Sequence, residues 1–152
     1  MVSGGQLAAA IEFKSQVGPS FGNNYNNRVE EAIGNAADLK TAFREGRLGP
    51  NRPLLGYFFL LEDTPAVHTP VGNKAPYFPV DPIFTGASYS RRYELLCQRL
   101  VYEQLYDAAC LTLATNAEAT QITHPSPTLD FRQFAARLQG HARGFAQSRQ
   151  GA

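Results

Sequence analysis

The stretch from residue 7 to residue 16 constrains the fold more than any other part of this sequence. Read as a β-strand it alternates, because side chains two residues apart lie on the same face. The two faces are Leu7, Ala9, Ile11 and Phe13 on one side, and Ala8, Ala10, Glu12, Lys14 and Gln16 on the other. On the second face an acid and an amine stand beside alanines, which leave open space. The pattern predicts a strand that carries a metal-dependent hydrolytic site.

Length and composition favour one intracellular domain. A chain of 152 residues can bury about two thirds of the surface that its unfolded form exposes, so residues 1–152 are expected to form a single domain. The 14 Lys and Arg nearly balance the 13 Asp and Glu, which argues neither for nor against nucleic acid as a partner. No apolar run reaches the about 20 residues that span a bilayer, and no signal peptide is apparent. A cytoplasmic protein with no membrane partner is therefore expected.

The cysteines and histidines do not follow a metal-binding pattern. Cys97 and Cys110 have no metal-type spacing with each other or with His68, His124 and His141. Buried free thiols in a reducing compartment are the expected state. The segment from residue 129 onward is locally basic, with four arginines and one acid.

Apolar periodicity predicts alternating strands and helices. Strands are expected at 7–16, 54–61 and 109–115, and helices at 28–45, 89–108 and 130–146. Asn27 followed by Glu30 is typical of a capping box at the start of the first helix. The segment 64–88 contains five prolines and no sustained period, which predicts an irregular connection. This order of elements predicts an α/β fold.

Gly4 and Gly5 immediately before the first strand predict a hairpin turn. Only two residues precede Ser3 and the two glycines, so the first hairpin arm is expected to be missing. The chain is therefore expected to begin inside a supersecondary unit.

Glu12 and Lys14 form an acid-x-Lys pattern on one strand face. Phosphodiester cleavage with Mg²⁺ needs carboxylate ligands, because this hard cation prefers oxygen. It also needs a cation that stabilises the charge developing on the phosphate and orients the attacking water. Glu12 can supply the ligand and Lys14 the cation. The same tripeptide also occurs on solvated strand faces that do no chemistry, so spacing alone leaves both interpretations open.

Several blocks of the sequence resemble the XhoI-like type II restriction endonucleases. The first block contains Glu12 and Lys14 within residues 9–24. The blocks that follow are Asn26-Asn27-Arg28, Glu30-Glu31-Ala32, 41–46, 60–63, 86–89 and 91–95. Together these blocks cover nearly all of the chain up to residue 115, and the first is too specific for coincidence.

The resemblance implies a restriction-endonuclease-like (PD-(D/E)-x-K) fold, a mixed sheet flanked by helices, of which this chain would be the C-terminal portion. It also implies a Mg²⁺ cofactor and a homodimer that cleaves double-stranded DNA at the palindrome CTCGAG. Glu12 would be the second acid of the motif and a metal ligand. Lys14 would be the lysine of the motif.

The sequence departs from the family pattern in one respect. The first acid of the motif is an Asp on the strand before the hairpin, and no acidic residue precedes Glu12 here. The missing Asp and the missing hairpin arm are the same absence. We therefore expect that this chain alone cleaves DNA poorly or not at all.

Several polar residues are candidates for contact with DNA. They are Asn23, Asn24, Asn26, Asn27, Arg28, Arg91 and Arg92. Asparagines read adenine edges or hold phosphates, but turn formation and helix capping also explain these four. Arg91 and Arg92 oppose the dipole at the start of a helix, which favours a phosphate partner, although a solvated face is an equal alternative.

Two further features stay open in the sequence. Glu30 or Glu31 could add an acid to the site, although helix-start electrostatics is the alternative for Glu30. The proline-rich loop with Lys74, Tyr77 and Phe78 could contact DNA or a second subunit.

Two alternatives stand beside the restriction enzyme. One is a non-catalytic remnant that binds DNA or only dimerises. The other is a nuclease of the same fold with a task such as repair or junction cleavage.

Overall fold

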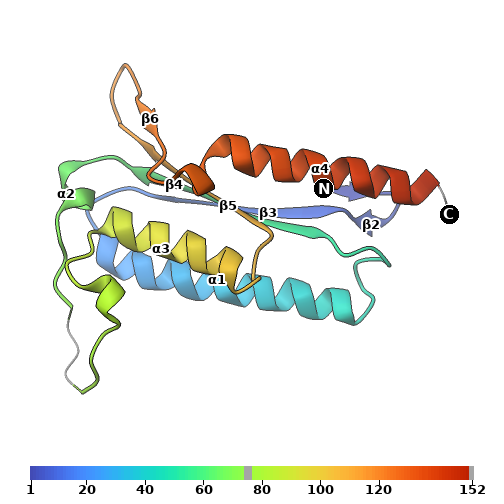
Figure 1. Ribbon diagram of the computed structural model, residues 1–152, viewed down its shortest axis with the longest axis horizontal. Coiled ribbons are helices and arrows are strands. Elements are labelled where there is room, and N and C mark those ends of the chain that lie inside the picture. The colour runs from blue at the N-terminus through green and yellow to red at the C-terminus, as the bar shows by residue number, and fades with distance from the viewer. Residues whose placement is uncertain (74–76, 151–152) are drawn as a thin grey trace.

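The computed structural model describes residues 1–73 and 77–150, and Figure 1 gives the arrangement of its elements. The strands are β1 (Val2–Ser3), β2 (Gln6–Leu7), β3 (Ala9–Gln16), β4 (Leu54–Glu62), β5 (Ala108–Ala114) and β6 (Ile122–Thr123). The α-helices are α1 (Phe21–Arg44), α2 (Pro65–His68), α3 (Tyr89–Tyr102) and α4 (Phe131–Gln150). Short 3-10 turns occupy Pro82–Phe84 and Pro127–Leu129.

A four-stranded mixed sheet forms the centre, in the order β3-β4-β5-β6. The first three strands are parallel, and β6 pairs with β5 in the antiparallel sense. Parallel neighbours need a crossover connection, and α1 and α3 supply the two crossovers. The register places Glu12 of β3 opposite Tyr57 of β4, which brings the charged face of β3 beside a buried aromatic residue.

The sheet is covered by helices on both faces. Figure 1 shows α1 and α3 together on one face and α4 on the other. The larger core lies on the α1 and α3 side, where Phe59 of β4 stacks on Tyr93 of α3 with ring centroids 4.2 Å apart. These layers confirm the predicted α/β class, and β4 is the strand predicted to be covered on both faces.

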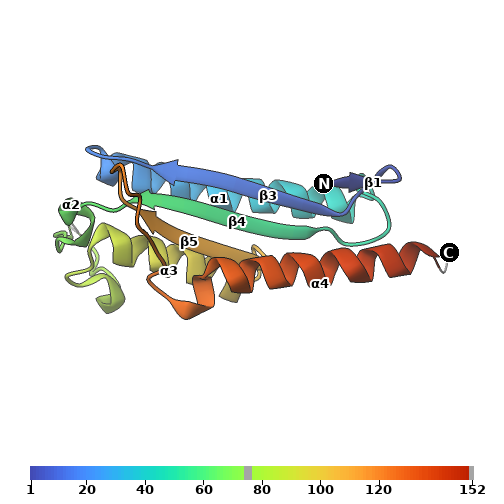
Figure 2. The same cartoon turned by 90° about the horizontal axis from the view of Figure 1, so that it is seen from above.

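The face under α4 is covered only in part. Phe134 of α4 packs with Ala108 and Cys110 of β5 in a small second core. Figure 2 shows α4 running along β5, with β3 at the far side of the sheet. Phe13 of β3 consequently remains 68% exposed on this face.

The hairpin predicted at Gly4 and Gly5 is confirmed. β1 pairs with β2 in the antiparallel sense, and both glycines have positive φ values, +56° and +75°. Glycine adopts this left-handed region at no steric cost, which a two-residue hairpin of this hand requires. Each arm is two residues long, and Val2–Ser3 forms the first one, so the expectation that the first arm is missing is wrong. Two residues suffice, because pairing in a hairpin starts directly beside its turn.

The start of the first helix was predicted too late. α1 begins at Phe21, and Ser20 is the N-cap residue, so the predicted capping box of Asn27 and Glu30 is wrong. The reason is tertiary packing: the rings of Phe21 and Tyr25 contact Tyr89 and Tyr93 of α3. This burial outweighs the modest helix propensity of the asparagines between them.

The second predicted helix is too long, because α3 ends at Tyr102. Gln104 has a φ of +58°, which ends the helical path, and Ala108 already belongs to β5. The two-residue strand β6 was not predicted.

Most of the predicted irregular connection is confirmed, although it contains α2 and the 3-10 turn at Pro82–Phe84. Lys74 lies outside the described residues. Tyr77 and Phe78 are exposed at 88% and 82%. Within the described parts of the chain, none of the helices is both long and apolar enough to cross a bilayer.

Candidate active site

β3 directs Glu12 and Lys14 toward α1, because alternate residues of a strand face the same side. The side chain of Glu12 is 13% exposed and that of Lys14 is 24% exposed. Lys14 Nζ lies 3.4 Å from Glu12 Oε1. The acid and the amine that the sequence placed on one face are therefore direct neighbours, and both remain accessible to solvent in part.

Three groups hold the carboxylate of Glu12. Asn35 of α1 donates from Nδ2 to Oε1 at 3.0 Å, and Lys14 lies on the same oxygen. The Tyr106 hydroxyl, 2.5 Å away, donates to Oε2. That hydroxyl also lies 3.1 Å from the backbone oxygen of Ala32. Burial, and then the hydrogen bond to Glu12, raises the pKa of Tyr106, so its hydroxyl keeps its proton.

Lys14 lies between two carboxylates. Its Nζ is 3.0 Å from Glu31 Oε2 on α1, in addition to its contact with Glu12. The hydrogen bond to Glu31, and then that to Glu12, raises the pKa of Lys14 against the opposing effect of desolvation. Lys14 is therefore a cation at neutral pH, which suits it to stabilise negative charge.

Glu31 of α1 forms ion pairs with two cations, Lys14 of β3 and Arg28 of α1. Arg28 Nη1 lies 2.7 Å from the same Glu31 oxygen that contacts Lys14. The hydrogen bonds from Lys14 and Arg28 lower the pKa of Glu31. Of the two acids considered on this helix, Glu31 contacts the charged pair of β3. Arg28 joins the site through Glu31.

A cavity of about 310 Å³ opens beside Glu12. Its walls include Ala10 of β3, Asn35 and Asp38 of α1, and Tyr106. Ala10 is one of the small residues that predicted open space on this face. Glu12 and Asp38 give this cavity two acids, and the Lys14 ammonium lies 3.4 Å from the Glu12 carboxylate.

The four asparagines proposed for DNA contact lie in the first two turns of α1. Asn23, Asn26 and Asn27 are exposed and Asn24 is half-buried. The helix start meets the start of α3, where Tyr25 donates its hydroxyl to the Arg92 backbone oxygen at 3.4 Å. The candidate residues of the two helices therefore gather at one end of the layer, beyond Arg28.

Arg91 and Arg92 differ in their contacts. Arg91 pairs with Glu94 one turn along α3 at 2.7 Å. Arg92 donates to the backbone oxygens of Ala87 and Val71 and to Oδ1 of Asn73, the last at 2.5 Å. Arg92 therefore connects both ends of the loop before α3, and contact with DNA stays a prediction for both arginines.

Comparison with known proteins places this sequence in a family. Residues 1–125 match the family described as restriction endonuclease XhoI. The chain belongs to the XhoI restriction endonuclease family. No solved structure matches it.

Three curated members of the XhoI family are similar to this chain. The type II restriction enzyme BstVI of Geobacillus stearothermophilus is 47% identical over 127 residues, which cover 83% of this chain and 57% of that enzyme. XhoI of Xanthomonas vasicola is 56% identical over 99 residues, covering 64% of this chain and 40% of the enzyme. AbrI of Azospirillum brasilense is 57% identical over 74 residues, or 48% and 33% of the two chains. These alignments span between a third and somewhat over half of each relative.

The family resemblance implies a magnesium ion at the site that contains Glu12 and Lys14. Magnesium commonly takes one or two carboxylates together with waters. Both oxygens of Glu12 are already engaged, and Glu31 is paired with Lys14 and Arg28. Over residues 1–73 and 77–150, no three His, Cys, Asp or Glu residues gather as a metal cluster. In this arrangement the residues do not form a complete magnesium site.

Sequence reasoning missed the two residues that hold Glu12 from other elements. Asn35 lies four residues after Glu31 on α1, so a helical wheel built from Glu31 places both on one face. Tyr106 precedes β5 without a local pattern that links it to Glu12. Its placement follows from the parallel sheet, which brings the start of β5 near β3.

Proposed function

We propose that this XhoI-family chain carries the Glu-x-Lys part of a type II restriction endonuclease site. The observation that supports it most is the pair of Glu12 and Lys14, 3.4 Å apart beside a cavity of about 310 Å³. The proposed reaction is Mg²⁺-dependent hydrolysis of double-stranded DNA at a palindrome, CTCGAG by family resemblance. The proposed protein is a cytoplasmic homodimer with a restriction-endonuclease-like sheet, and residues 1–152 form one domain that is the C-terminal portion of the nuclease domain.

Each residue of the pair has a distinct proposed role. Lys14 is a cation that stabilises charge on the scissile phosphate and orients the attacking water. Glu12 would hold the Mg²⁺ ion. Because the site residues do not form a complete magnesium site, we infer that this chain alone binds Mg²⁺ weakly and cleaves DNA poorly or not at all.

A second candidate function is a non-catalytic remnant that binds DNA or only dimerises. The observation that favours it is the engagement of both Glu12 oxygens by Asn35, Tyr106 and Lys14. These three groups contact the two oxygens through which Glu12 would bind the metal ion.

A cleavage assay with the purified chain separates the two functions. Duplexes with CTCGAG and with a scrambled site are incubated with Mg²⁺ or with EDTA, and the products are resolved on denaturing gels. The nuclease proposal predicts slow cutting at CTCGAG that needs Mg²⁺ and is lost in Glu12→Ala. Glu118→Ala, which removes an exposed acid far along the chain, is the matched control.

The outcomes are distinct. Slow cutting that Glu12→Ala abolishes and Glu118→Ala preserves supports the nuclease. Binding of the duplex without any cutting supports the remnant. Fast cutting by the chain contradicts the inferred impairment, and cutting that survives Glu12→Ala contradicts the assignment of Glu12.

A further inference from the structure

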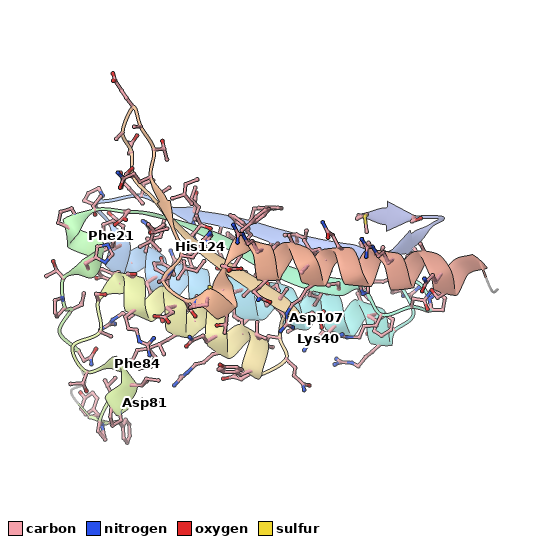
Figure 3. The ribbon with its side chains drawn as sticks, turned by 45° about the horizontal axis from the view of Figure 1, so that its top comes forward. Phe21, Lys40, Asp81, Phe84, Asp107 and His124 are labelled. Carbon is pink, nitrogen blue, oxygen red and sulfur yellow. The ribbon has the colours of Figure 1, made fainter. Side chains whose placement is uncertain are left out.

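A second and larger cavity, of about 610 Å³, lies where α1 and α3 end. Four basic side chains line it together with one acid. We call this site the basic pocket, and its charged residues are Lys40, Arg44, Arg52, Arg137 and Asp107. Figure 3 places Lys40 and Asp107 close together, far from Phe21 at the start of α1. The basic pocket is therefore separate from the helix starts that carry the asparagines and Arg91.

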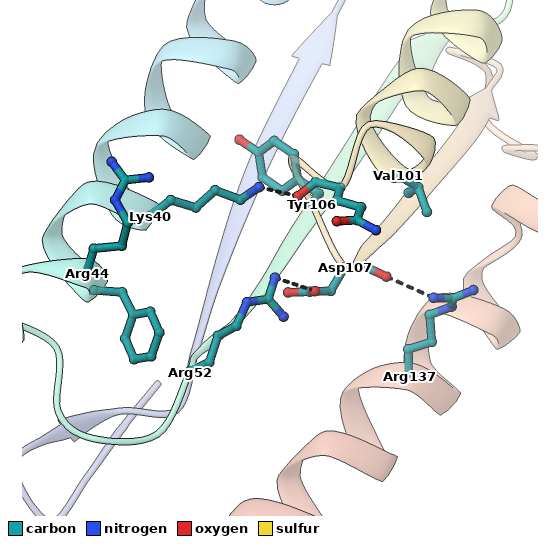
Figure 4. Close-up of a pocket in the computed structure, with 9 residues that line it drawn as sticks. Lys40, Arg44, Arg52, Val101, Tyr106, Asp107 and Arg137 are labelled. Atoms are coloured by element: carbon teal, nitrogen blue, oxygen red, sulfur yellow. Dashed lines mark hydrogen bonds and ion pairs between the residues drawn. The ribbon is translucent and has the colours of Figure 1, made fainter.

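The basic side chains come from different parts of the fold. Lys40 and Arg44 lie on α1, Arg52 precedes β4, and Arg137 lies on α4, and Figure 4 shows them around the segment before β5. A cation at the carboxyl end of a helix is favoured by the helix dipole, which explains Arg44. Arg52 and Arg137 approach the same space through their contacts with Asp107. Four cations beside one acid leave the basic pocket with a net positive charge, which favours an anionic ligand.

Asp107, the acid of the basic pocket, already forms contacts that stabilise the fold. Asp107 Oδ2 accepts from the Leu55 backbone nitrogen at 2.8 Å, and its Oδ1 pairs with Arg52 at 2.7 Å. Lys40 donates to the backbone oxygen of Gln104, and Arg137 to that of Asp107 at 2.9 Å. Lys40 and Arg137 are thus anchored through neutral carbonyls, which leave their charge uncompensated.

The chemistry of these side chains favours phosphate. Arginine presents a planar set of donors that matches phosphate oxygens in pairs, and lysine adds a compact charge. An Arg or Lys that contacts a carbonyl retains further donors for a ligand. The space between the side chains admits a phosphate group with its ester substituents.

The basic pocket adjoins the site at Glu12. Tyr106 lines both cavities, and its hydroxyl holds Glu12. Double-stranded DNA presents phosphates along the whole of each strand, so one duplex can offer phosphates to both cavities. We propose that the basic pocket binds a backbone phosphate of double-stranded DNA beside the phosphate that lies at Glu12. This rests on the proposed function and adds to it a phosphate subsite.

The test measures duplex binding rather than cleavage. A fluorescein-labelled duplex of about 20 base pairs with CTCGAG is titrated by anisotropy in EDTA, at several NaCl concentrations between about 50 and 200 mM. Lys40→Gln with Arg44→Gln removes two charges from the basic pocket. Arg132→Gln with Arg143→Gln removes two exposed charges from α4 outside the pocket and is the matched control.

The pocket variant is expected to bind about tenfold more weakly, and the magnitude of the slope of log K against log salt is expected to fall by about one, since the basic pocket holds one phosphate. The control is expected to stay within twofold of wild type. In the wild type the Arg44 side chain bonds Thr41 of its own helix, and Arg44→Gln alone is expected to lower the slope by less than the double variant does. This single variant keeps the test valid if the double variant unfolds.

Each outcome is decisive. A pocket variant that binds like wild type overturns the subsite and leaves the proposed nuclease intact. Equal losses in the pocket variant and the control also overturn it, because the effect is then one of overall charge. A wild-type chain that does not bind the duplex at any salt concentration overturns both proposals.

One more measurement separates DNA from a small anion. Inorganic phosphate is titrated against wild type and the pocket variant by calorimetry. Tight phosphate binding that the variant loses, with duplex binding unchanged, assigns the basic pocket to a free phosphate and overturns the proposal. Weak phosphate binding together with the loss of duplex binding supports it.

Discussion

The hydroxyl of Tyr106 lies 2.5 Å from Oε2 of Glu12, although the two residues are 94 positions apart in the chain. Tyr106 is 2% exposed, and its ring packs on Tyr57 with centroids 5.3 Å apart. The fold therefore fixes the candidate catalytic carboxylate through a buried tyrosine of another element.

Replacing Tyr106 with Phe tests this contact. Tyr106→Phe removes the donor and leaves the Glu12 and Ala32 oxygens without it, so we expect a loss of about 1–3 kcal/mol in the free energy of unfolding. Urea denaturation measures the change. Tyr102→Phe, at a tyrosine that is 76% exposed, is expected to change stability by less than about 0.5 kcal/mol. Equal effects of the two variants would show that the hydroxyl does not hold Glu12.

The ion pairs of Glu31 predict a pH dependence of stability. The pKa of Glu31 is lowered from its ordinary 4.5 by hydrogen bonds from Lys14 and Arg28. Its contribution is therefore present above about pH 4.5 and is lost as the pH falls through the lower folded-state value. Glu31→Gln is expected to be less stable than wild type at pH 7, by less than about 1 kcal/mol because the pair is exposed.

Urea midpoints at pH 7 and pH 3 measure this effect. The difference between wild type and Glu31→Gln should be smaller at pH 3 than at pH 7, because a falling pH progressively protonates the wild-type carboxylate. Glu30→Gln, at the exposed neighbour, should show no such convergence. A difference that is the same at both pH values would contradict the assignment to Glu31.

The hydrogen bonds of Arg92 are expected to stabilise the loop before α3. Arg92→Gln removes the donors that connect Val71, Asn73 and Ala87. We expect faster protease cleavage within this loop and a stability loss of about 1–2 kcal/mol. Arg91→Gln, which removes only the pair with Glu94, should leave the cleavage rate near wild type. If Arg92→Gln weakens duplex binding without faster cleavage, DNA contact is its main role.

Replacement of Gly56 and of Gly34 by alanine is expected to have opposite effects on the stability of the protein. A Cβ at Gly56 would lie 3.1 Å from Cζ of Phe134, a buried side chain of α4. Gly56→Ala is expected to cost about 1–3 kcal/mol by overpacking. A Cβ at Gly34 on α1 meets nothing within 4 Å, so Gly34→Ala is expected to stabilise by about 0.5–1 kcal/mol. Thermal unfolding of both variants tests the pair, and a stabilised Gly56→Ala would contradict the packing of α4 on β4.

The sequence predicted the strands better than the helix ends. Alternation in β3 and the apolar run of β4 are local patterns, and the sheet confirms both. The start of α1 was hidden because asparagines favour turns, while the rings that bury this first turn come from α3. The helical period of α3 continues to Leu105 in the sequence, but the positive φ of Gln104 has no signal in its side chain.

The candidate site was predicted in part for the same reason. Glu12 and Lys14 share a strand, so their spacing alone placed them together. Asn35 and Tyr106 reach Glu12 only through the packing of α1 and the start of β5 on the sheet. Local patterns do not encode such contacts. The basic pocket is hidden in the same way, because its charges are spread from Lys40 to Arg137.

The long separation between Glu12 and Tyr106 has a consequence for how the protein matures. Contacts between distant residues form only after the loops between them have closed, and that closure is slow for parallel sheets. Both crossover connections must form before Tyr106, which precedes β5, can reach across β4 to Glu12 of β3. A partly folded chain would therefore carry Glu12 without the tyrosine that holds it. We expect the Tyr106 hydroxyl to reach Glu12 late in folding.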